Sequence, residues 1–169
     1  MTPPGLETLT RGLESRRMQR LWLSGRAAVL GCALLVAGCS SFNREWKAAA
    51  QRPAAPGSIE GRWQGTWRSD ANGHTDELRC LITRTNDAYS ARFHARYRKV
   101  VRFSFGYTVP LVVTAKEGGA QFEGAANLGW LAGGRYTYKG SATPTNFFST
   151  YSCKYDYGVF EMTRPKPEQ

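Results

Sequence analysis

The chain has 169 residues, of which 41% are hydrophobic and 12% aromatic. This composition allows one ordinary globular domain with a real core, and it excludes an intrinsically disordered chain. Lysine and arginine outnumber the acidic residues by 23 to 13, which gives a formal net charge of +10 and favours anionic partners.

The first 38 residues have the composition of an export signal. An uncharged segment, residues 27–38, follows a positively charged stretch that contains Arg16, Arg17, Arg20 and Arg26. This segment is too short to cross a bilayer as a helix, which needs about 20 apolar residues. We therefore predict a signal peptide over residues 1–38. Met18 is an alternative start that gives a signal peptide of more usual length.

The end of the apolar segment carries a cleavage motif. Leu35-Val36-Ala37-Gly38-Cys39 is followed by Ser40 and resembles the lipobox of bacterial lipoproteins. The resemblance implies cleavage before Cys39 and lipidation of its thiol, because a thiolate is the nucleophile that takes the diacylglycerol. In proteobacterial lipoproteins a serine after this cysteine directs the protein to the outer membrane, so Ser40 implies a periplasm-facing protein anchored there. The alternative is an ordinary signal peptide with a chance cysteine.

Removal of the predicted signal peptide changes the charge of the chain. The first 38 residues carry five arginines and two acids, so the mature chain has a formal charge of +7. A basic protein in the cell envelope meets anionic lipid head groups, lipopolysaccharide or cell-wall polymer before any nucleic acid. We therefore expect membrane attachment through the anchor and no nucleic-acid partner.

The four cysteines divide between the signal peptide and the exported domain. Cys32 leaves with the signal peptide and Cys39 is expected to be lipidated, so Cys80 and Cys153 remain. In an oxidising compartment such a pair is expected to form a disulfide. The first and last strands of a closed meander are neighbours, so this disulfide would staple the seam. The alternative, two ligands of a metal site, lacks the close Cys or His spacing of such sites.

The rest of the chain divides into a linker and a β-rich domain. Residues 39–57 are polar and rich in alanine and proline, and they predict a lipidated tether with one or two helical turns around Trp46 to Gln51. Residues 58–169 alternate between apolar and polar side chains, a period of two that indicates strands with one buried face.

This alternation predicts about eight strands, separated by turn formers such as Asn72-Gly73. They cover residues 61–68, 78–84, 89–97, 101–113, 121–128, 135–142, 147–153 and 157–164. No long helical pattern interrupts them, so neighbours should pair antiparallel. We predict an all-β, eight-stranded antiparallel up-and-down β-barrel, because closure removes both exposed edges. A two-sheet β-sandwich is the alternative.

The first predicted strand resembles a known opening motif. Gly61-Arg62-Trp63 resembles the Gly-x-Trp motif of the calycin superfamily, which includes lipocalins and avidins, and Gly65-Thr66-Trp67 is similar to a second copy. The resemblance implies that Trp63 packs across the closed end of a barrel. No later lipocalin motif and no avidin biotin site is matched, so neither ligand class is carried over. Tyr151-Ser152-Cys153 also resembles the cysteine context of lysozyme-inhibiting lipoproteins, but a basic chain is repelled by cationic lysozymes.

Catalysis has little support in the residues. His74 and His94 are the two histidines of the chain, and none of the common hydrolase, metalloprotease or phosphate-binding motifs is present. His74 is expected in a hairpin turn, and His94 on a solvated face between Arg92 and Arg96. We expect no enzyme activity, no cofactor and no metal.

Two sets of residues are candidate binding sites. Inward-facing aromatic side chains and one loop tryptophan predict a pocket for a small hydrophobic ligand: Trp63, Trp67, Tyr89, Phe93, Tyr97 and Trp130. Outward-facing cations predict a strip that contacts an anionic envelope component: Arg92, Arg96, Arg98, Lys99 and Arg102. A solvated strand face is the alternative for the strip, and a barrel filled by side chains, which acts through its surface, is the alternative for the pocket.

Overall fold

The computed structural model describes residues 41–52, 54–55, 57–98 and 102–166, which belong to a compact unit that begins at Ser41. The predicted signal peptide and Cys39 lie outside the described residues. None of the helices in the described ranges has the length and hydrophobicity needed to span a membrane.

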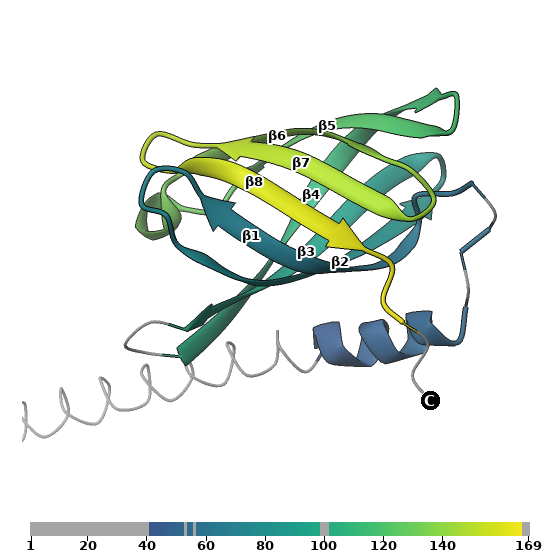
Figure 1. Ribbon diagram of the computed structural model, residues 1–169, viewed down its shortest axis with the longest axis horizontal. Helices are drawn as coiled ribbons and strands as arrows, with labels where there is room; N and C mark the ends of the chain where they lie inside the picture. The colour runs from purple at the N-terminus through teal and green to yellow at the C-terminus, as the bar shows by residue number, and fades with distance from the viewer. Residues whose placement is uncertain (1–40, 53, 56, 99–101, 167–169) are drawn as a thin grey trace, which may run out of the picture. The chain divides into compact units, whose positions relative to one another are not determined.

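Eight antiparallel strands form a closed barrel (Figure 1). They are β1 (Gly61–Ser69), β2 (Thr75–Thr85), β3 (Ala88–Arg98), β4 (Arg102–Lys116), β5 (Gly119–Asn127), β6 (Arg135–Ala142), β7 (Asn146–Ser152) and β8 (Tyr157–Thr163), with a 3₁₀ turn, η1 (Trp130–Ala132), before β6. Each strand pairs with the next in the chain, and β8 returns to pair with β1. The predicted up-and-down barrel is confirmed, and the two-sheet sandwich is wrong.

The strand boundaries follow the predicted ones closely, with the largest differences at the start of β2 and at the end of β4, which each extend three residues farther than predicted. Strand β2 begins at Thr75, three residues before the predicted start, and its first residues pair with the end of β1 through Arg68↔Thr75 and Trp67↔Asp76. Thr75 to Glu77 are polar, so their side chains give no strand signal. These residues are extended because they pair with the backbone of β1, and local strand propensity does not predict this pairing.

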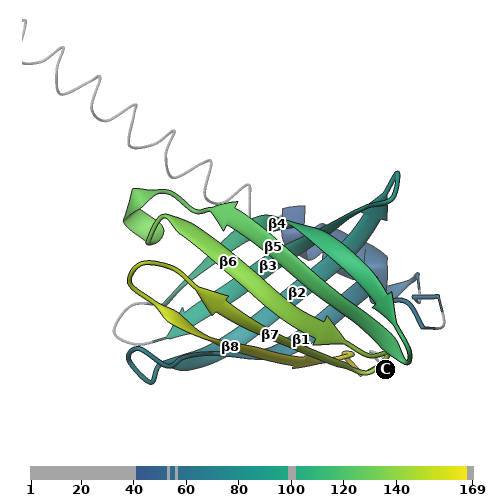
Figure 2. The ribbon, with the colours of Figure 1, turned by 90° about the horizontal axis from the view of Figure 1, so that it is seen from above.

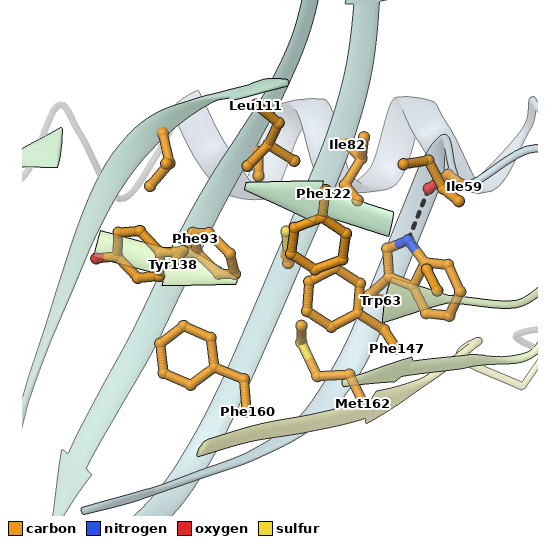
Figure 3. Packing of buried hydrophobic residues seen from close by; sticks show 14 of the residues in the cluster. Ile59, Trp63, Ile82, Phe93, Leu111, Phe122, Tyr138, Phe147, Phe160 and Met162 are labelled. Atoms are coloured by element: carbon orange, nitrogen blue, oxygen red, sulfur yellow. Dashed lines mark hydrogen bonds between the residues drawn. The ribbon is translucent and has the colours of Figure 1, made fainter. Parts of the chain in front are cut away.

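One end of the barrel is closed around Trp63, which is fully buried (Figure 3). Its indole Nε1 donates a hydrogen bond to the carbonyl of Ile59 at 2.9 Å, and its ring packs against Phe147. The Arg164 guanidinium lies 3.7 Å from the Trp63 ring centroid and donates hydrogen bonds to the carbonyls of Ser58 and Glu60. Trp63 therefore lies at the centre of the packing that closes this end of the barrel.

The predicted disulfide between Cys80 and Cys153 is absent, and both cysteines are free thiols. The seam of the barrel joins β1 to β8, whereas Cys80 lies on β2 and Cys153 follows β7. Two strands therefore separate the strands that carry the cysteines. Cys80 is fully buried in the core, and burial raises the pKa of its thiol well above the usual value.

The first half of the predicted tether is a helix, residues 41–50, that packs on the outside of the barrel. Phe42 and Trp46 are almost fully buried against Leu81 of β2. Arginines from three strands contact the helix. Arg62 of β1 and Arg79 of β2 lie over the Trp46 ring, and Arg92 of β3 donates a hydrogen bond to Glu45. The alanine-rich sequence of this segment favours a helix. The burial of Phe42 and Trp46 was not predictable from it, because these side chains are covered by the barrel surface.

Gly65 marks a point where β1 and β8 approach too closely for a side chain. A Cβ atom built on Gly65 overlaps the carbonyl oxygen of Glu161 on β8. We therefore expect Gly65→Ala to push the seam apart and to lower the free energy of unfolding by about 3 kcal/mol, measured by urea denaturation. Gly106→Ala is the matched control, because a Cβ there meets its nearest neighbour at 3.4 Å, an ordinary contact. Equal losses in both variants would contradict this account.

Candidate ligand-binding site

A cavity of about 750 Å³ opens at the end of the barrel opposite Trp63. This open end, called the mouth below, is formed by the ends of β1, β3, β5 and β7 and by the loops that follow them; Figure 2 shows η1 and the β7–β8 turn at this same end. The closed end is filled by packed side chains, so the interior is divided between a core and a pocket.

Aromatic rings form most of the cavity wall. Trp67 and Tyr97 stack on one side with ring centroids 6.3 Å apart. Tyr107, Tyr136 and Tyr151 line the other strands, and Phe160 packs on Tyr151 at 4.9 Å. The volume lies within the range of about 300–1,000 Å³ that small-molecule sites occupy, and the aromatic wall suits an apolar molecule.

The Trp67 side of the wall is held by contacts outside the cavity. The indole Nε1 of Trp67 donates a hydrogen bond to the carbonyl of Arg96 at 3.1 Å. The imidazole of His74 packs on Trp67 at 5.0 Å and on Tyr97 at 4.3 Å. His74 lies in the connection between β1 and β2, as the predicted hairpin turn requires, and its buried ring supports the wall.

One acidic side chain, Asp156, lies at the rim of the cavity. Its carboxylate accepts hydrogen bonds from the Ser69 hydroxyl at 2.6 Å and from the Tyr151 hydroxyl at 3.2 Å. These bonds tie the β7–β8 turn to the end of β1 and fix the direction of the Tyr151 hydroxyl. The carboxylate therefore has protein partners on both oxygens.

The phenols of Tyr107, Tyr136 and Tyr151 remain neutral at physiological pH, because the pKa of each is raised. Burial raises the pKa of Tyr136, and the Cys153 thiol beside it adds to this shift. Burial also raises the pKa of Tyr151, with Asp156 as the next cause, and burial raises the pKa of Tyr107 well above its usual value. Neutral phenols donate and accept hydrogen bonds without attracting a charged group, so the site offers polar contacts to a neutral ligand.

Two of the predicted ligand-binding residues line the cavity and four do not. Trp67 and Tyr97 are part of the wall, and Phe93 packs beneath it against Tyr107. Trp63 and Tyr89 lie toward the closed end and are not among the residues that line the cavity. Alternation identifies inward-facing side chains, but the position along the barrel axis depends on strand direction, which reverses at every turn.

Three lining tyrosines were missed as pocket residues: Tyr107, Tyr136 and Tyr151. Each lies near the mouth end of its strand, on β4, β6 and β7. The signal that could have found them is their distance from the turns, since in an up-and-down barrel the ends of odd strands and the starts of even strands meet at one rim.

Trp130 stands out from the rim and does not close the cavity. Its side chain is 85% exposed, and it is not part of the cavity wall. Its neighbours Leu128 and Ala132 do line the cavity, so the loop forms one edge of the opening. Trp130 thus lies outside the cavity wall, beside the edge of the opening, and its contact with a ligand stays a prediction.

The predicted basic strip is partly engaged by protein groups. Arg92 donates hydrogen bonds to Glu45 at 2.5 Å and to Ser41 at 2.6 Å, both on the docked helix. Arg96 pairs with Glu77 at 2.6 Å. Lys99 lies outside the described residues, and only the backbone is described for Arg98 and Arg102. At Arg92 the strip therefore binds the helix over residues 41–50. The alternation of the strand does not predict this contact.

His94 lies beneath the helix and is not solvated as predicted. Its ring is 9% exposed and stacks on Phe42 with centroids 4.8 Å apart. Its Nε2 is buried without a hydrogen-bond partner. Burial lowers the pKa of His94, and Arg79, Arg96 and Arg92 lower it further.

Metal binding has no support within the described ranges, where no three His, Cys, Asp or Glu side chains form a group suited to a metal ion. Comparisons with protein-family models, with curated proteins and with solved structures found no match to this chain. The site is therefore interpreted from its own geometry.

The His94 environment predicts a pH dependence of stability. Because the folded state lowers the pKa of His94 below its usual 6.5, the unfolded chain binds this proton more readily. Stability from the neutral imidazole is complete above about pH 6.5 and decreases as the pH falls below that value. We expect the urea concentration at half-unfolding to be lower at pH 5.5 than at pH 7.5. The decrease should be smaller in His94→Phe, which retains the stacking on Phe42. Identical pH dependence in the two proteins would show that His94 does not contribute.

Proposed function

We propose that this protein is a lipid-anchored binding protein of the bacterial cell envelope, which holds a small, neutral, largely apolar molecule in the mouth cavity. The observation that carries the proposal is the 750 Å³ cavity with its aromatic wall. A barrel whose only task is to present its surface gains stability by filling its interior, as this barrel does at the closed end. The open half is better explained by a ligand.

The charges around the cavity favour a neutral molecule. The wall, as far as the structure describes it, contains Asp156 and no lysine or arginine. An anionic head group inside the cavity would find no cation and would be repelled by this carboxylate. The carboxylate already accepts two hydrogen bonds, so it does not require a cationic ligand. Neutral phenols supply the remaining polar contacts.

The anchor and the kinship with calycins are parts of the same proposal. The lipobox residues that end at Cys39 support lipidation and outer-membrane sorting. The position of Trp63 at the closed end, with the ligand space at the other end, supports a calycin-like arrangement. The second candidate, an interaction protein with a filled barrel and a basic contact face, is less well supported, because Arg92 and Arg96 already pair with Glu45 and Glu77.

Ligand binding is tested with an apolar fluorescent probe, N-phenyl-1-naphthylamine, and a secreted form that begins at Ser40. We expect a saturable rise in probe fluorescence with the unmodified domain. Ala95→Phe places a large side chain in the cavity from β3, and it should weaken probe binding at least about tenfold, or about 1.4 kcal/mol. Val112→Phe is the control, because Val112 is 75% exposed on the outer surface of β4.

A second blocking variant guards against misfolding of Ala95→Phe. Ala132→Trp adds a large side chain at the exposed edge of the cavity, where it has little effect on the core. Circular dichroism confirms that each variant retains its strands. Probe binding that survives both Ala95→Phe and Ala132→Trp in folded protein would overturn the proposed site.

A further inference from the structure

Exposed aromatic side chains gather at the mouth of the barrel. Six large hydrophobic side chains are exposed in the described part of the chain, and four of them belong to the mouth: Phe105, Trp130, Tyr155 and Tyr157. Trp130 and Tyr155 are 85% and 69% exposed. Isolated apolar residues on a surface are ordinary, but several aromatic rings around one opening indicate a surface that meets another phase or partner.

The loop that carries Trp130 is built to hold this side chain away from the barrel. Gly129, Gly133 and Gly134 all have positive φ, at 85°, 91° and 81°, which glycine adopts without strain. The amide of Gly134 donates to the carbonyl of Gly129 at 2.9 Å, and Leu128 donates to Gly134 at 2.9 Å. This hydrogen-bonded loop presents Trp130 outward as a defined feature.

Positive charge accompanies the aromatic side chains at this end. The Lys154 ammonium lies over the Tyr155 ring at 5.1 Å in the β7–β8 turn. Arg98 and Arg102 form the last register pair of β3 and β4, so the backbone of both residues lies at the mouth end. The acidic Asp70 in the neighbouring β1–β2 turn is paired with Arg68 at 3.0 Å. Aromatic rings beside cations are the composition that partitions into an anionic lipid head-group layer.

The docked helix directs the chain toward the same end. Ala49 and Ala50 lie near Gly61 and Arg164 at the closed end, so the helix over residues 41–50 begins on the mouth side of that point (Figures 1 and 2). A helix of ten residues is about 15 Å long. Ser41, two residues after Cys39 in the sequence, accepts a hydrogen bond from Arg92 on the barrel at 2.6 Å, so a lipid on Cys39 would be attached two residues from the barrel surface.

We propose that the mouth of the barrel rests on the anionic bilayer surface to which the protein is anchored, with Trp130 and Tyr155 in the head-group layer. This inference rests on the lipid anchor and the ligand cavity of the proposed function, and it adds an orientation and a source for the ligand. With the mouth against the bilayer, a neutral apolar molecule exchanges between the lipid phase and the cavity without crossing water. The short reach of the anchor raises the effective concentration of the rim at the surface.

The test uses the full chain, produced in a bacterium that processes lipoproteins and reconstituted into vesicles. The vesicles contain phosphatidylcholine and phosphatidylglycerol with brominated acyl chains, which quench nearby tryptophan. The difference between the spectra of the unmodified protein and Trp130→Phe reports Trp130 alone. We expect this difference spectrum to be blue-shifted and to lose more than half of its intensity with brominated lipid. A solvent-like, unquenched difference spectrum would overturn the proposal.

A relocated tryptophan is the matched control. Val112→Trp in the Trp130→Phe background adds an exposed tryptophan on β4, away from the mouth. We expect its fluorescence to remain unquenched, and quenching equal to that of Trp130 would show that the barrel has no preferred orientation. Lys154→Glu and vesicles of phosphatidylcholine alone should each reduce the quenching of Trp130. If Trp130 is quenched equally in the Lys154→Glu variant and on phosphatidylcholine vesicles, anionic lipid is rejected as the binding partner.

The cavity variant separates this inference from the proposed function. Ala95→Phe should weaken probe binding at least about tenfold while the quenching of Trp130 remains, because the rim does not depend on the interior. Quenched Trp130 in a protein that never binds the apolar probe would retain the orientation and reject the ligand. A protein that binds the probe while Trp130 stays in water would retain the ligand and reject the orientation.

Discussion

The pairing of β1 with β8 closes the sheet, and the closed sheet determines where every other feature lies. The seam runs from Gln64↔Thr163 to Ser69↔Gly158, and it requires residues without a side chain at two close approaches. A Cβ on Gly65 overlaps the backbone of Glu161, and one on Gly158 overlaps the backbone of Arg68. Closure satisfies the backbone groups that an edge strand leaves unpaired, and it creates an interior with two ends.

The two ends of this interior have different chemistry because different strand positions meet there. At the closed end, Trp63 and Phe147 pack together and Arg164 stacks across the indole while it donates to three neighbouring carbonyl groups. At the mouth, four tyrosines join Phe105 and Phe160 on the wall, and Asp156 accepts hydrogen bonds at the rim. A packed base therefore supports a cavity that is open at one end, which is the arrangement that the proposed ligand requires.

The helix over residues 41–50 connects the barrel surface to the proposed anchor. Phe42 and Trp46 bury themselves against Leu81, and Arg92 binds Glu45 and Ser41. Arg92 was predicted to contact an external anion, and it instead contacts an acid of the same chain. His94 shares this interface and burial lowers its pKa, so we expect the contact between helix and barrel to weaken in acid.

The sequence by itself determined the eight strands and their antiparallel order, because a period of two and the turn formers between strands are local properties. Only the tertiary structure decided which aromatic residues line the cavity, since Tyr107, Tyr136 and Tyr151 meet through the alternating direction of the strands. It also decided the docking of residues 41–50 and the separation of Cys80 from Cys153. These depend on contacts between distant segments, which no local pattern encodes.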